Sequence, residues 1–329
     1  MTNSTNSFIS AQQVADLAGV SRSAVSRTFT KGASVSAKTR ERVLNAAAEL
    51  GYHVNHLAKG LHNKSNIVSL ITTDINTPFQ SRFIDTLSRN LQKINKVTML
   101  INTKSDDESV TEALNQTLNF RAEVSVVLSG HPSKALIDQC IRNGQRVILV
   151  NRNYVHPDAD NIRVNNSGSA KKALDILLSQ GCKNIALVNS DINSSSLMAR
   201  ETGFLNAAKQ EKLSVQVLRY GDSSYASGAL LAKRLNRHID GVFCVTDLLA
   251  CGLMDSMKSQ GINVPEDIAI VGFDDIEQAS WDSYQLTTFR QPIDKITSHI
   301  IERIQATTDA PNIDYQYTLD AVMRQTTKQ

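Results

Sequence analysis

The chain of 329 residues is poor in aromatic residues and in cysteine, and no long apolar run occurs in it. Its four cysteines, Cys140, Cys182, Cys244 and Cys251, are widely spaced and stand among apolar residues, which predicts buried thiols rather than zinc ligands or disulfides. No apolar stretch approaches the roughly 20 residues that a membrane span needs, and residues 1–7 are polar and uncharged, unlike a signal peptide. A cytoplasmic protein with no membrane partner is therefore expected.

The motifs of common nucleotide and hydrolase sites are also missing. No Gly-x-Gly-x-x-Gly follows the first apolar run, no Walker loop occurs, and Gly-x-Ser-x-Gly is absent. Dinucleotide, nucleotide and serine-hydrolase chemistry therefore lack their sequence marks. We expect a protein that is not an enzyme and that holds no cofactor and no metal ion.

Positive charge, by contrast, is concentrated near the N-terminus. Through Lys64, eight Lys and Arg residues stand against three Asp and Glu residues, which gives this segment a net charge of +5. Since the whole chain carries +3, the remainder carries −2. A localised positive charge of this kind is typical of a phosphate-binding module attached to a nearly neutral body.

The basic segment has the pattern of three short helices. The apolar residues of Ala11–Ala18 have the spacing of a helix, and Gly19 ends this predicted helix. Ser21 is a suitable N-cap for a second helix. This tight connection is typical of a helix-turn-helix. A third helix is expected between Ser36 and Gly51. The predicted core positions are Val14, Leu17, Ala18, Ala24, Val25, Val43, Ala46, Ala47 and Leu50.

The second helix has one polar face. At 100° per residue, Arg22, Ser23, Ser26 and Arg27 spread over about 140° of its circumference, and its two apolar residues point the other way. Taken alone, such a face is more often the solvated surface of a three-helix bundle. The surrounding positive charge favours a DNA-binding surface instead.

Four motifs in residues 9–61 carry a family resemblance: Val-Ala-Asp-Leu-Ala-Gly-Val-Ser, Val-Ser-Arg, Val-Ser-Ala-Lys-Thr-Arg-Glu-Arg-Val and Glu-Leu-Gly-Tyr. They resemble the DNA-binding headpiece of the LacI/GalR family of bacterial transcriptional repressors. The resemblance implies that residues 21–28 enter the major groove of double-stranded operator DNA. Arg22 and Ser23 match the positions that select the operator, and Arg27 matches a base-contacting arginine. Arginine can bond guanine O6 and N7 together, which agrees with these roles.

Residues 55–61 are similar to the family's hinge helix, a segment that orders on DNA. The resemblance implies that Leu61 enters the minor groove, where an apolar wedge unstacks a base step and kinks the duplex. Gly60 weakens a helix by about 1 kcal/mol relative to Ala, and a plain linker is the alternative. Ser21, Ser36 and Thr39 are expected to hold phosphates. The predicted DNA-binding residues are Ser21, Arg22, Ser23, Ser26, Arg27, Asn55, Lys59 and Leu61.

Beyond residue 66, short apolar runs alternate with amphipathic stretches of helical length. Strands alternating with helices predict parallel sheets with helices on both faces, and a length of about 265 residues favours two such halves. The expected strands are 67–71, 97–101, 124–128, 147–150, 185–188, 215–218, 242–245 and 268–271. Examples of the expected helices are 83–94, 170–178 and 227–235.

This part resembles the family's core, which has the periplasmic-binding-protein fold of two Rossmann-like subdomains. The motifs include Asn151-Arg152, Val164-Asn165-Asn166-Ser167-Gly168, Arg200 with Gly203-Phe204, Thr246-Asp247, Val271-Gly272-Phe273-Asp274-Asp275 and Leu286-Thr287-Thr288. The predicted fold is an all-α helix-turn-helix headpiece plus an α/β core. The expected domains are 1–53, the helix-turn-helix; 54–65, the hinge and linker; and 66–329, with an N-subdomain at about 66–163 and 291–319 and a C-subdomain at about 164–290 and 320–329.

Polar residues follow most of the predicted strands. In open α/β sheets, ligands bind outside the carboxyl ends of the strands, so these residues form a candidate effector site. The resemblance implies that Arg200 grips the effector and that Asp274 accepts hydrogen bonds from it; for both, an internal ion pair or a cap is the alternative. The predicted effector-binding residues are Phe79, Gln80, Ser129, Asn151, Arg152, Arg200, Ser223, Thr246 and Asp274.

Three of these positions depart from the family pattern. Asn151 replaces the usual Asp before Arg152, and Thr246 replaces the usual Asn before Asp247. Ser223 stands where some members have a stacking aromatic residue. Compared with the family pattern, two polar side chains that would bind the effector are therefore replaced by weaker hydrogen-bonding groups, and one aromatic ring that would stack on it is absent.

These departures bear on the identity of the ligand. Phe79, Tyr225 or Trp281 could supply a ring against a sugar. With Arg152 and Arg200 both at the site, an acidic sugar or a phosphorylated metabolite is at least as consistent with the sequence as a neutral sugar.

Together these features predict a sequence-specific transcription regulator, expected as a repressor of a carbohydrate or related metabolic operon. A small effector (sugar, sugar acid or sugar phosphate) would bind between the subdomains and control the protein allosterically, and DNA-bound protein would be associated with the nucleoid. A homodimer is expected because one headpiece reads too few base pairs and twofold symmetry matches a pseudo-palindromic operator. Residues 324–327 match the family's final strand. The alternative is a solute-binding receptor or sugar enzyme with a basic N-terminal tail and no operator recognition.

Overall fold

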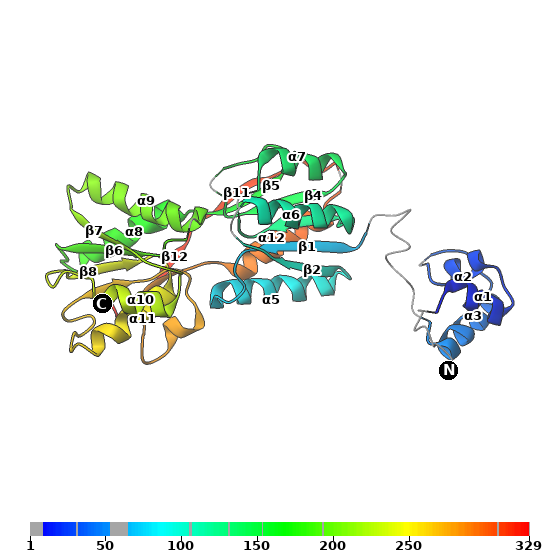
Figure 1. Ribbon diagram of the computed structural model, residues 1–329, viewed down its shortest axis with the longest axis horizontal. Helices are drawn as coiled ribbons and strands as arrows, with labels where there is room; N and C mark the ends of the chain where they lie inside the picture. Colours follow the sequence, from blue (N-terminus) through cyan, green and yellow to red (C-terminus); the bar gives the residue numbers. More distant parts are fainter. Residues whose placement is uncertain are drawn as a thin grey trace. The chain divides into compact units, whose positions relative to one another are not determined.

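The computed structural model describes residues 9–30, 32–52, 65–104, 107–130, 132–152, 154–192, 194–307 and 309–328. The chain divides into two compact units, Met1–Ser65 and Asn66–Gln329. The described part of the first unit is helical, and the second contains two parallel sheets with helices on both faces (Figure 1). The predicted fold class is therefore confirmed.

Local sequence signals define the helices of the first unit, the headpiece. The side chains of Ser10, Ser21 and Ser36 each accept a hydrogen bond from the main-chain N–H three residues further on. Gly19 and Gly51 end two of the helices with left-handed φ values of 60° and 65°, a conformation that glycine adopts without strain. The predicted caps and helix ends are confirmed. The helices are α1 (Ala11–Ala18), α2 (Arg22–Thr28) and α3 (Ala37–Leu50).

The headpiece core contains one fully buried valine from each helix, Val14, Val25 and Val43. Small neighbours such as Ala15 complete the cluster. Leu17 was wrongly expected in this core: it is 47% exposed. The apolar stripe of α1 instead runs through Val14, Ala15 and Ala18, so that Leu17 points outward.

Two arginines of α3 fasten the other helices. Arg42 Nη2 donates to the main-chain oxygen of Ala18, and also to that of Gly19 at 3.3 Å. Arg40 Nη1 donates to the oxygen of Thr28 at 2.9 Å. Since these oxygens belong to the ends of α1 and α2, the bonds satisfy carbonyls that a helix end leaves open. The third helix therefore fixes the turn of the helix-turn-helix.

The second unit begins with a six-stranded parallel sheet in the order β11-β5-β4-β3-β1-β2. Helices α5 and α12 pack together on one face, and α6 and α7 cover the other (Figure 1). The strands are β1 (Ile67–Thr72), β2 (Val97–Asn102), β3 (Val124–Val127), β4 (Arg146–Val150), β5 (Asp160–Val164) and β11 (Asp314–Tyr317). The helices are α5 (Pro78–Lys93), α6 (Asp107–Asn119), α7 (Lys134–Arg142) and α12 (Ile293–Gln305).

A four-stranded parallel sheet follows, in the order β7-β6-β8-β9. Helices α8 and α9 pack together, as do α10 and α11 on the opposite face (Figure 1). The strands are β6 (Ile185–Asn189), β7 (Val215–Arg219), β8 (Gly241–Cys244) and β9 (Ala269–Val271). The helices are α8 (Asn166–Ser179), α9 (Ser195–Gln210), α10 (Tyr225–Ala232), α11 (Asp247–Lys258) and the short 3₁₀ helix η1 (Glu277–Ser280).

The chain passes between these sheets three times. It leaves the six-stranded sheet after β5, returns through β10 (Thr288–Arg290) into α12, and leaves again from β11 to β12 (Asp320–Val322). Strands β10 and β12 pair with each other in antiparallel fashion. Two of the crossing segments are therefore joined directly by main-chain hydrogen bonds.

All eight apolar runs form strands, but four strands escaped prediction: β5, β10, β11 and β12. Strand β5 has the sequence DNIRV, in which Asp160 and Asn161 are buried although polar. Asp160 Oδ1 accepts from Arg303 Nε at 3.0 Å and from the N–H of Ile313 at 3.1 Å. Because both partners come from distant segments, no local pattern marks this strand.

The expected final strand at residues 324–327 is wrong. The final strand is Asp320–Val322, and residues 325–327 form a turn and bend. The turn nevertheless lies against the sheet, since the N–H of Ile270 donates to the oxygen of Thr326 at 3.0 Å and Thr326 Oγ1 donates back to Ile270 at 2.7 Å.

The four cysteines are buried and unpaired, as expected. Burial raises the pKa of the Cys140 and Cys182 thiols to about 11, so these groups stay protonated at neutral pH. No helix in the described ranges is long and apolar enough to cross a membrane.

Helices α10 and α11 approach each other closely at two glycines. A Cβ atom on Gly252 would lie 1.9 Å from the oxygen of Tyr225, and one on Gly228 would lie 2.1 Å from the oxygen of Leu249. Both obstacles are backbone atoms, so a side chain could fit only if the helices moved apart.

We expect Gly252→Ala to lower the free energy of unfolding by about 1–3 kcal/mol, since a methyl group would overpack this contact. Urea denaturation followed through Trp281, the single tryptophan, would measure the loss. Gly144→Ala is the matched control: Gly144 has a φ of 80°, but a Cβ atom there would meet no neighbour within 4 Å, so only backbone strain is added. A smaller loss in Gly252→Ala than in the control would contradict the close contact.

Candidate DNA-binding surface and effector site

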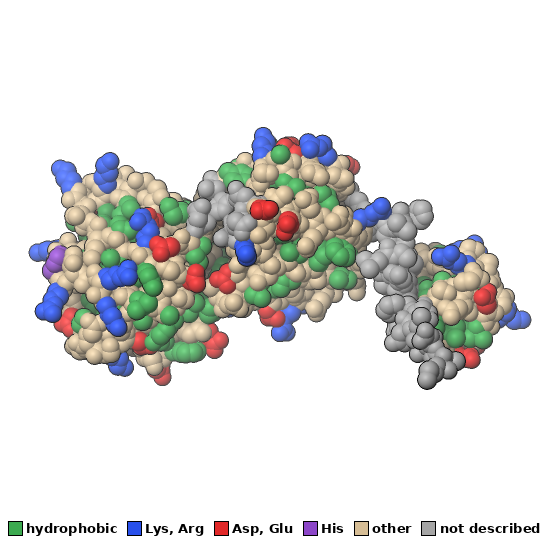
Figure 2. Space-filling model, viewed as in Figure 1, with side chains coloured by type: hydrophobic (Ala, Val, Ile, Leu, Met, Phe, Trp, Pro, Cys, Tyr) green, Lys and Arg blue, Asp and Glu red, His purple; other side chains and the backbone are tan. Residues whose placement is uncertain are grey.

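The polar face of α2 is exposed. Arg22, Ser23, Ser26 and Arg27 all lie at the surface, as does the N-cap Ser21. The apolar residues of the same helix, Ala24 and Val25, are buried in the headpiece core. Lys and Arg side chains are visible on the headpiece surface in Figure 2. The helix therefore presents the predicted face to solvent, with two arginines on it.

Hydroxyl groups at the starts of α2 and α3 are linked in pairs. Ser21 Oγ accepts from the N–H of Ala24 at 3.2 Å and lies 2.9 Å from Ser23 Oγ. Ser36 Oγ accepts from the N–H of Thr39 at 3.2 Å and donates to Thr39 Oγ1 at 2.8 Å. The caps are real, and the phosphate contacts assigned to Ser21, Ser36 and Thr39 stay predictions.

Asn55, Lys59 and Leu61 lie outside the described residues, as does most of the predicted hinge segment 54–65. Their expected contacts with DNA are therefore predictions from the sequence alone.

At the carboxyl ends of β1 and β3, several polar side chains form one network. Gln80 Nε2 donates to Thr72 Oγ1 at 2.9 Å, and Ser129 Oγ donates to the same oxygen at 3.2 Å. Ser129 Oγ also accepts from the N–H of Thr73 at 2.5 Å. Two predicted site residues, Gln80 and Ser129, thus meet through Thr72, which the sequence reasoning missed although it ends the first apolar run.

Arg152 is buried at the carboxyl end of β4 with 7% of its surface exposed. Its guanidinium group donates to three main-chain oxygens: those of Val150 at 2.8 Å, Leu128 at 2.7 Å and Gly130. Burial lowers the pKa of this group to about 10, so Arg152 is charged at neutral pH. It joins the ends of β3 and β4.

Asn151, Ser223 and Thr246 make contacts within the protein. Asn151 has a left-handed φ of 55°, and its Oδ1 accepts from the N–H of Val164 at 2.8 Å. This bond joins the ends of β4 and β5. Ser223 Oγ and Thr246 Oγ1 lie 2.8 Å apart at the carboxyl end of the four-stranded sheet. The structure thus brings Ser223 and Thr246 together, as the sequence predicted for residues of one site.

Arg200 and Asp274 form a buried ion pair. Arg200 Nη1 lies 3.2 Å from Asp274 Oδ1, while its Nε donates to Asn166 Oδ1 at 3.0 Å and its Nη1 to the oxygen of Val245 at 2.6 Å. The guanidinium carbon lies 3.5 Å from the ring centroid of Phe273. Burial lowers the pKa of Arg200 and raises that of Asp274, and the opposite charge of each partner counteracts both shifts. The internal ion pair that the sequence left open as an alternative is present.

Two further polar groups at this site were missed. Gln291 Nε2 donates to Asp274 Oδ1 at 2.7 Å, and its Oε1 is buried with no partner in the part of the chain that the structure describes. Ser190, which follows β6 directly, has a buried Oγ that likewise has no described partner. Gln291 follows β10 at the predicted crossing near residue 290, and that position was the one signal that could have found it.

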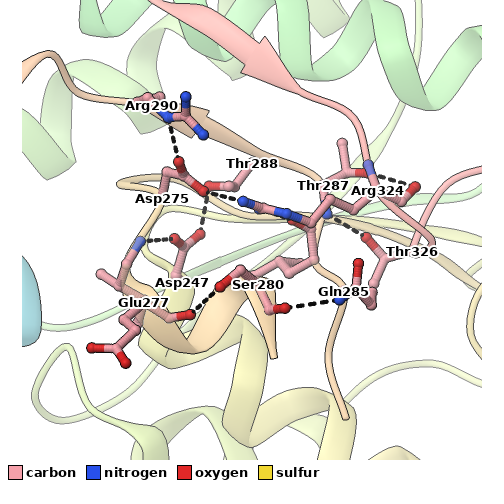
Figure 3. A network of polar contacts seen from close by, with 12 residues as sticks. Asp247, Asp275, Glu277, Ser280, Gln285, Thr287, Thr288, Arg290, Arg324 and Thr326 are labelled. Carbon is pink, nitrogen blue, oxygen red and sulfur yellow. Dashed lines mark hydrogen bonds and ion pairs between the residues drawn. The ribbon is translucent and has the colours of Figure 1, made fainter. Parts of the chain in front are cut away.

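Asp247, at the start of α11, is fully buried beside this site (Figure 3). Its Oδ1 accepts from Thr288 Oγ1 at 2.6 Å, and its Oδ2 accepts from the N–H of Ile276 at 3.0 Å. Burial raises the pKa of Asp247 to about 7, and the nearby charge of Asp274 acts in the same direction. This carboxyl therefore fastens the crossing strand β10 to the end of the four-stranded sheet.

Asp275 connects two crossing segments (Figure 3). Its Oδ2 lies 2.5 Å from Arg290 Nε, at the end of β10, and its Oδ1 lies 2.6 Å from Arg324 Nη2, beyond β12. Arg324 Nη1 also donates to the oxygen of Leu286 at 2.7 Å. The residue directly after Asp274 thus holds both segments.

Of the three candidate rings, Phe79 lies in the first turn of α5 and packs against Phe83 with ring centroids 6.2 Å apart. Tyr225 Oη donates to Asp255 at 2.6 Å, and Trp281 stacks on Tyr284 at 6.4 Å. Tyr225 and Trp281 are therefore occupied by contacts of their own on the surface of the four-stranded half.

Asp138, His156 and Asp158 form a cluster of potential metal ligands, but the position of the proton on the His156 ring does not suit a metal ion. Ligand atoms of Asp138, His156 and Asp158 lie within 4.8 Å of one another. The N–H of Asp158 donates to His156 Nδ1 at 3.2 Å, so the neutral ring carries its proton on Nε2, which lies 3.2 Å from Asp138 Oδ1 without a hydrogen bond among the described residues. A metal ion would need a lone pair at Nε2. The geometry therefore fits a histidine–carboxylate pair.

Two protein-family models match the chain. The model of bacterial regulatory proteins of the lacI family matches residues 11–55, and that of a periplasmic binding protein-like domain matches residues 174–327. The ribose operon repressor of Haemophilus influenzae is 26% identical over 311 residues, which cover 93% of each chain.

Solved structures share the fold over nearly the whole chain. The lac repressor dimer bound to operator and the anti-inducer ONPF aligns with a TM-score of 0.85 at 22% identity, covering 97% of this chain and 99% of that one. A LacI family transcriptional regulator from Enterococcus faecium with bound ribose aligns with a TM-score of 0.70 at 24% identity, covering 79% and 98%.

A helix-turn-helix headpiece joined to a periplasmic-binding-protein-like unit defines a DNA-binding transcriptional regulator. The headpiece matches a family model of bacterial regulatory proteins, the larger unit matches one of a periplasmic binding protein-like domain, and curated relatives are transcriptional regulators rather than enzymes. The headpiece thus matches the lacI family of bacterial regulatory proteins, and the chain is similar to a transcriptional repressor over nearly its whole length.

The raised pKa of Asp247 predicts a pH-dependent stability. Its pKa is about 7 in the folded protein against an ordinary value of 3.8, so its contribution is complete below about pH 4 and is lost as the pH rises through 7. We expect the free energy of unfolding of the wild type to fall by up to about 4 kcal/mol relative to Asp247→Asn over this range. The asparagine stays uncharged and can still bond Thr288 and Ile276.

Urea denaturation at pH 4 and pH 7.5, followed through Trp281, would measure this difference. Asp282→Asn, which changes an exposed carboxylate, is the control. If the wild type and Asp247→Asn lost stability in parallel, Asp247 would not be the titrating group.

Proposed function

We propose that this protein is a repressor that binds operator DNA as a homodimer and responds to a small, carbohydrate-derived effector held between its two subdomains. The exposed face of α2 is the observation that carries the proposal. Arg22 and Ser23 lie in the first turn of that helix and Arg27 lies one turn further on. Residues at the start of a recognition helix reach base edges in the major groove.

The way in which α2 is held supports this role. The bonds from Arg42 to Ala18 and Gly19 fix the turn before it, and Ser21 caps its first turn. A rigid helix loses little conformational freedom on binding, so its side chains are preorganised for the groove. Leu61 would then enter the minor groove beside it, as the family resemblance implies.

Exposed apolar residues support the homodimer. Val97 and Leu100 are exposed on β2, an edge strand of the six-stranded sheet. Tyr225, Leu230 and Trp281 are exposed on the other half, where hydrophobic side chains gather over α10 and α11 (Figure 2). Exposed apolar side chains on the surface are typical of sites of association when they gather there. A second copy would cover both patches, in keeping with the lac repressor, which was solved as a dimer on its operator.

Polar groups at the strand ends support an effector rich in hydroxyl groups. Arg200 offers donors and Asp274 offers acceptors, and the buried oxygens Gln291 Oε1 and Ser190 Oγ have no partner among the described residues. In open α/β sheets this edge is where ligands bind. The Enterococcus faecium relative holds ribose, which has the same hydroxyl chemistry.

The proposal assigns the sensing role to residues 66–329, with subdomain limits near residues 163, 290 and 320, and no catalytic role to any residue. It also places the protein in the cytoplasm, where operator DNA is accessible. A solute-binding receptor or sugar enzyme with a basic tail is the competing function.

Substituting Arg22 tests the recognition helix. An operator would first be selected from a random duplex pool with the full-length protein. We expect Arg22→Ala to weaken binding to that duplex about 5- to 150-fold, equivalent to about 1–3 kcal/mol for one bidentate base contact. Fluorescence anisotropy would measure the dissociation constants. Arg89→Ala, which removes an exposed arginine paired with Asp85 in the larger unit, should leave the affinity unchanged.

A salt titration of the same duplex separates the two functions. A headpiece that grips phosphates must lose affinity linearly on a plot of log K against log salt concentration. Weak binding with no dependence on salt would instead favour the receptor or enzyme.

Ligand response tests the effector site. Among pentoses, hexoses and their acids and phosphates, we expect at least one compound to change operator affinity about 5- to 150-fold. Ser190→Ala should weaken that compound's binding about fivefold, because one hydrogen bond is lost, without lowering stability. Thr98→Val is the control, since Thr98 Oγ1 is also buried and unpartnered among the described residues but lies near the start of β2. Equal effects of both variants would contradict a site at the strand ends.

A further inference from the structure

Arg152 is a buried cation that lacks a neutralising carboxylate among the described residues. Ion pairs occur throughout the larger unit, and Arg200 is paired with Asp274 in this way. Within the part of the chain that the structure describes, Arg152 donates to main-chain oxygens alone, those of Val150, Leu128 and Gly130. Arg152 and Arg200, which the sequence predicts at one site, therefore differ. The charge of Arg200 is neutralised by an ion pair, and that of Arg152 is not neutralised by any described carboxylate.

An unpaired buried charge is unfavourable, and proteins ordinarily pair it or bind a counter-ion to it. The three carbonyl dipoles satisfy donors but do not cancel the positive charge. A guanidinium group has five N–H donors, and three of them are used here. Two donors and one full charge therefore have no partner among the described residues.

The neighbouring residue explains why the charge is unbalanced. Asn151 stands where the family resemblance places an aspartate. Its Oδ1 accepts from the N–H of Val164 at 2.8 Å, a bond that a carboxylate could equally accept. Asn151 therefore keeps the hydrogen bond to Val164 but does not supply the negative charge of an aspartate.

One acidic side chain, Asp74, follows β1 at this edge, and its Oδ1 accepts from the N–H of Asn76 at 2.9 Å; it forms no ion pair with Arg152 among the described residues. Gly130, one of the three partners of Arg152, follows Ser129, which is bonded through Thr72 to Gln80 in the first turn of α5. That turn contains no acidic residue, and the N-cap Thr77 makes no side-chain cap. The positive end of the α5 dipole therefore adds to the field of Arg152.

We propose that the effector carries a carboxylate or phosphate group that lies against Arg152, while its hydroxyl groups meet Arg200, Asp274 and Gln291. This inference rests on the proposed effector site and defines the class of ligand: a sugar acid or sugar phosphate. The anionic end of the ligand faces the six-stranded half, and its polyol end faces the four-stranded half.

Asn151→Asp tests the charge balance without requiring a known ligand. The substitution supplies the missing carboxylate, and the left-handed φ of 55° at this position is one that aspartate tolerates. Asn95→Asp is the matched control, because Asn95 has a φ of 57° and is exposed at the end of α5. We expect Asn151→Asp to raise the Tm of the ligand-free full chain above that of the control. No rise would overturn the claim that Arg152 is unbalanced.

Anion binding is measured on the same three proteins. At constant ionic strength, inorganic phosphate or acetate in place of chloride should raise the Tm of the wild type by about 3 °C or more. The shift should persist in Asn95→Asp and be lost in Asn151→Asp. A stronger response to phosphate indicates a phosphorylated ligand, and a stronger response to acetate indicates a sugar acid. An equal response of the wild type to all three anions overturns the proposal.

A panel of D-ribose, D-ribose 5-phosphate, D-glucose, D-glucose 6-phosphate and D-glucuronate separates this inference from the proposed function. If only neutral sugars change operator affinity, the anionic ligand is wrong and the regulator stands. If the protein binds no duplex in a salt-dependent manner, the proposed function itself fails, whatever the anion response.

Discussion

The arrangement of the larger unit depends on two buried carboxylates at its crossings. Asp275 holds Arg290 and Arg324, which belong to two of the three segments that pass between the sheets, and Asp247 holds Thr288 on one of them. These bonds join the crossing segments to the end of the four-stranded sheet. Asp274 directly precedes Asp275, so a ligand that bonds Asp274 acts next to the point where the halves are joined.

The two ends of the candidate effector site use charge differently. Asp274 neutralises the charge of Arg200, and the Phe273 ring covers the Arg200 guanidinium group. Arg200 can therefore orient a ligand through hydrogen bonds, but the ion pair has no net charge. Arg152 is held only by carbonyl oxygens and keeps its charge. Because both arginines are buried, the low dielectric around them strengthens this difference.

Features with a local signal could be predicted from the sequence, and features that depend on distant partners could not. The Ser21 cap, the Gly19 turn and the apolar runs buried on both sheet faces are local. Strand β5 is not, because Asp160 needs Arg303 and Ile313, which lie 143 and 153 positions away. Similarly, the positions of Arg200 and Asp274 could be inferred, whereas the unpartnered oxygen of Gln291 is evident only when the crossing brings it beside Asp274.

The position of β11 has a consequence for synthesis on the ribosome. This strand completes the six-stranded sheet beside β5, yet it ends at Tyr317, near the end of the chain. The headpiece, with contacts among residues close in sequence, can fold as soon as it emerges. The sheet that follows it must wait with the edge of β5 open until the whole four-stranded half and α12 have been made, and an open edge invites pairing with other chains. The nascent regulator therefore acquires its DNA-reading part long before its sensor is closed.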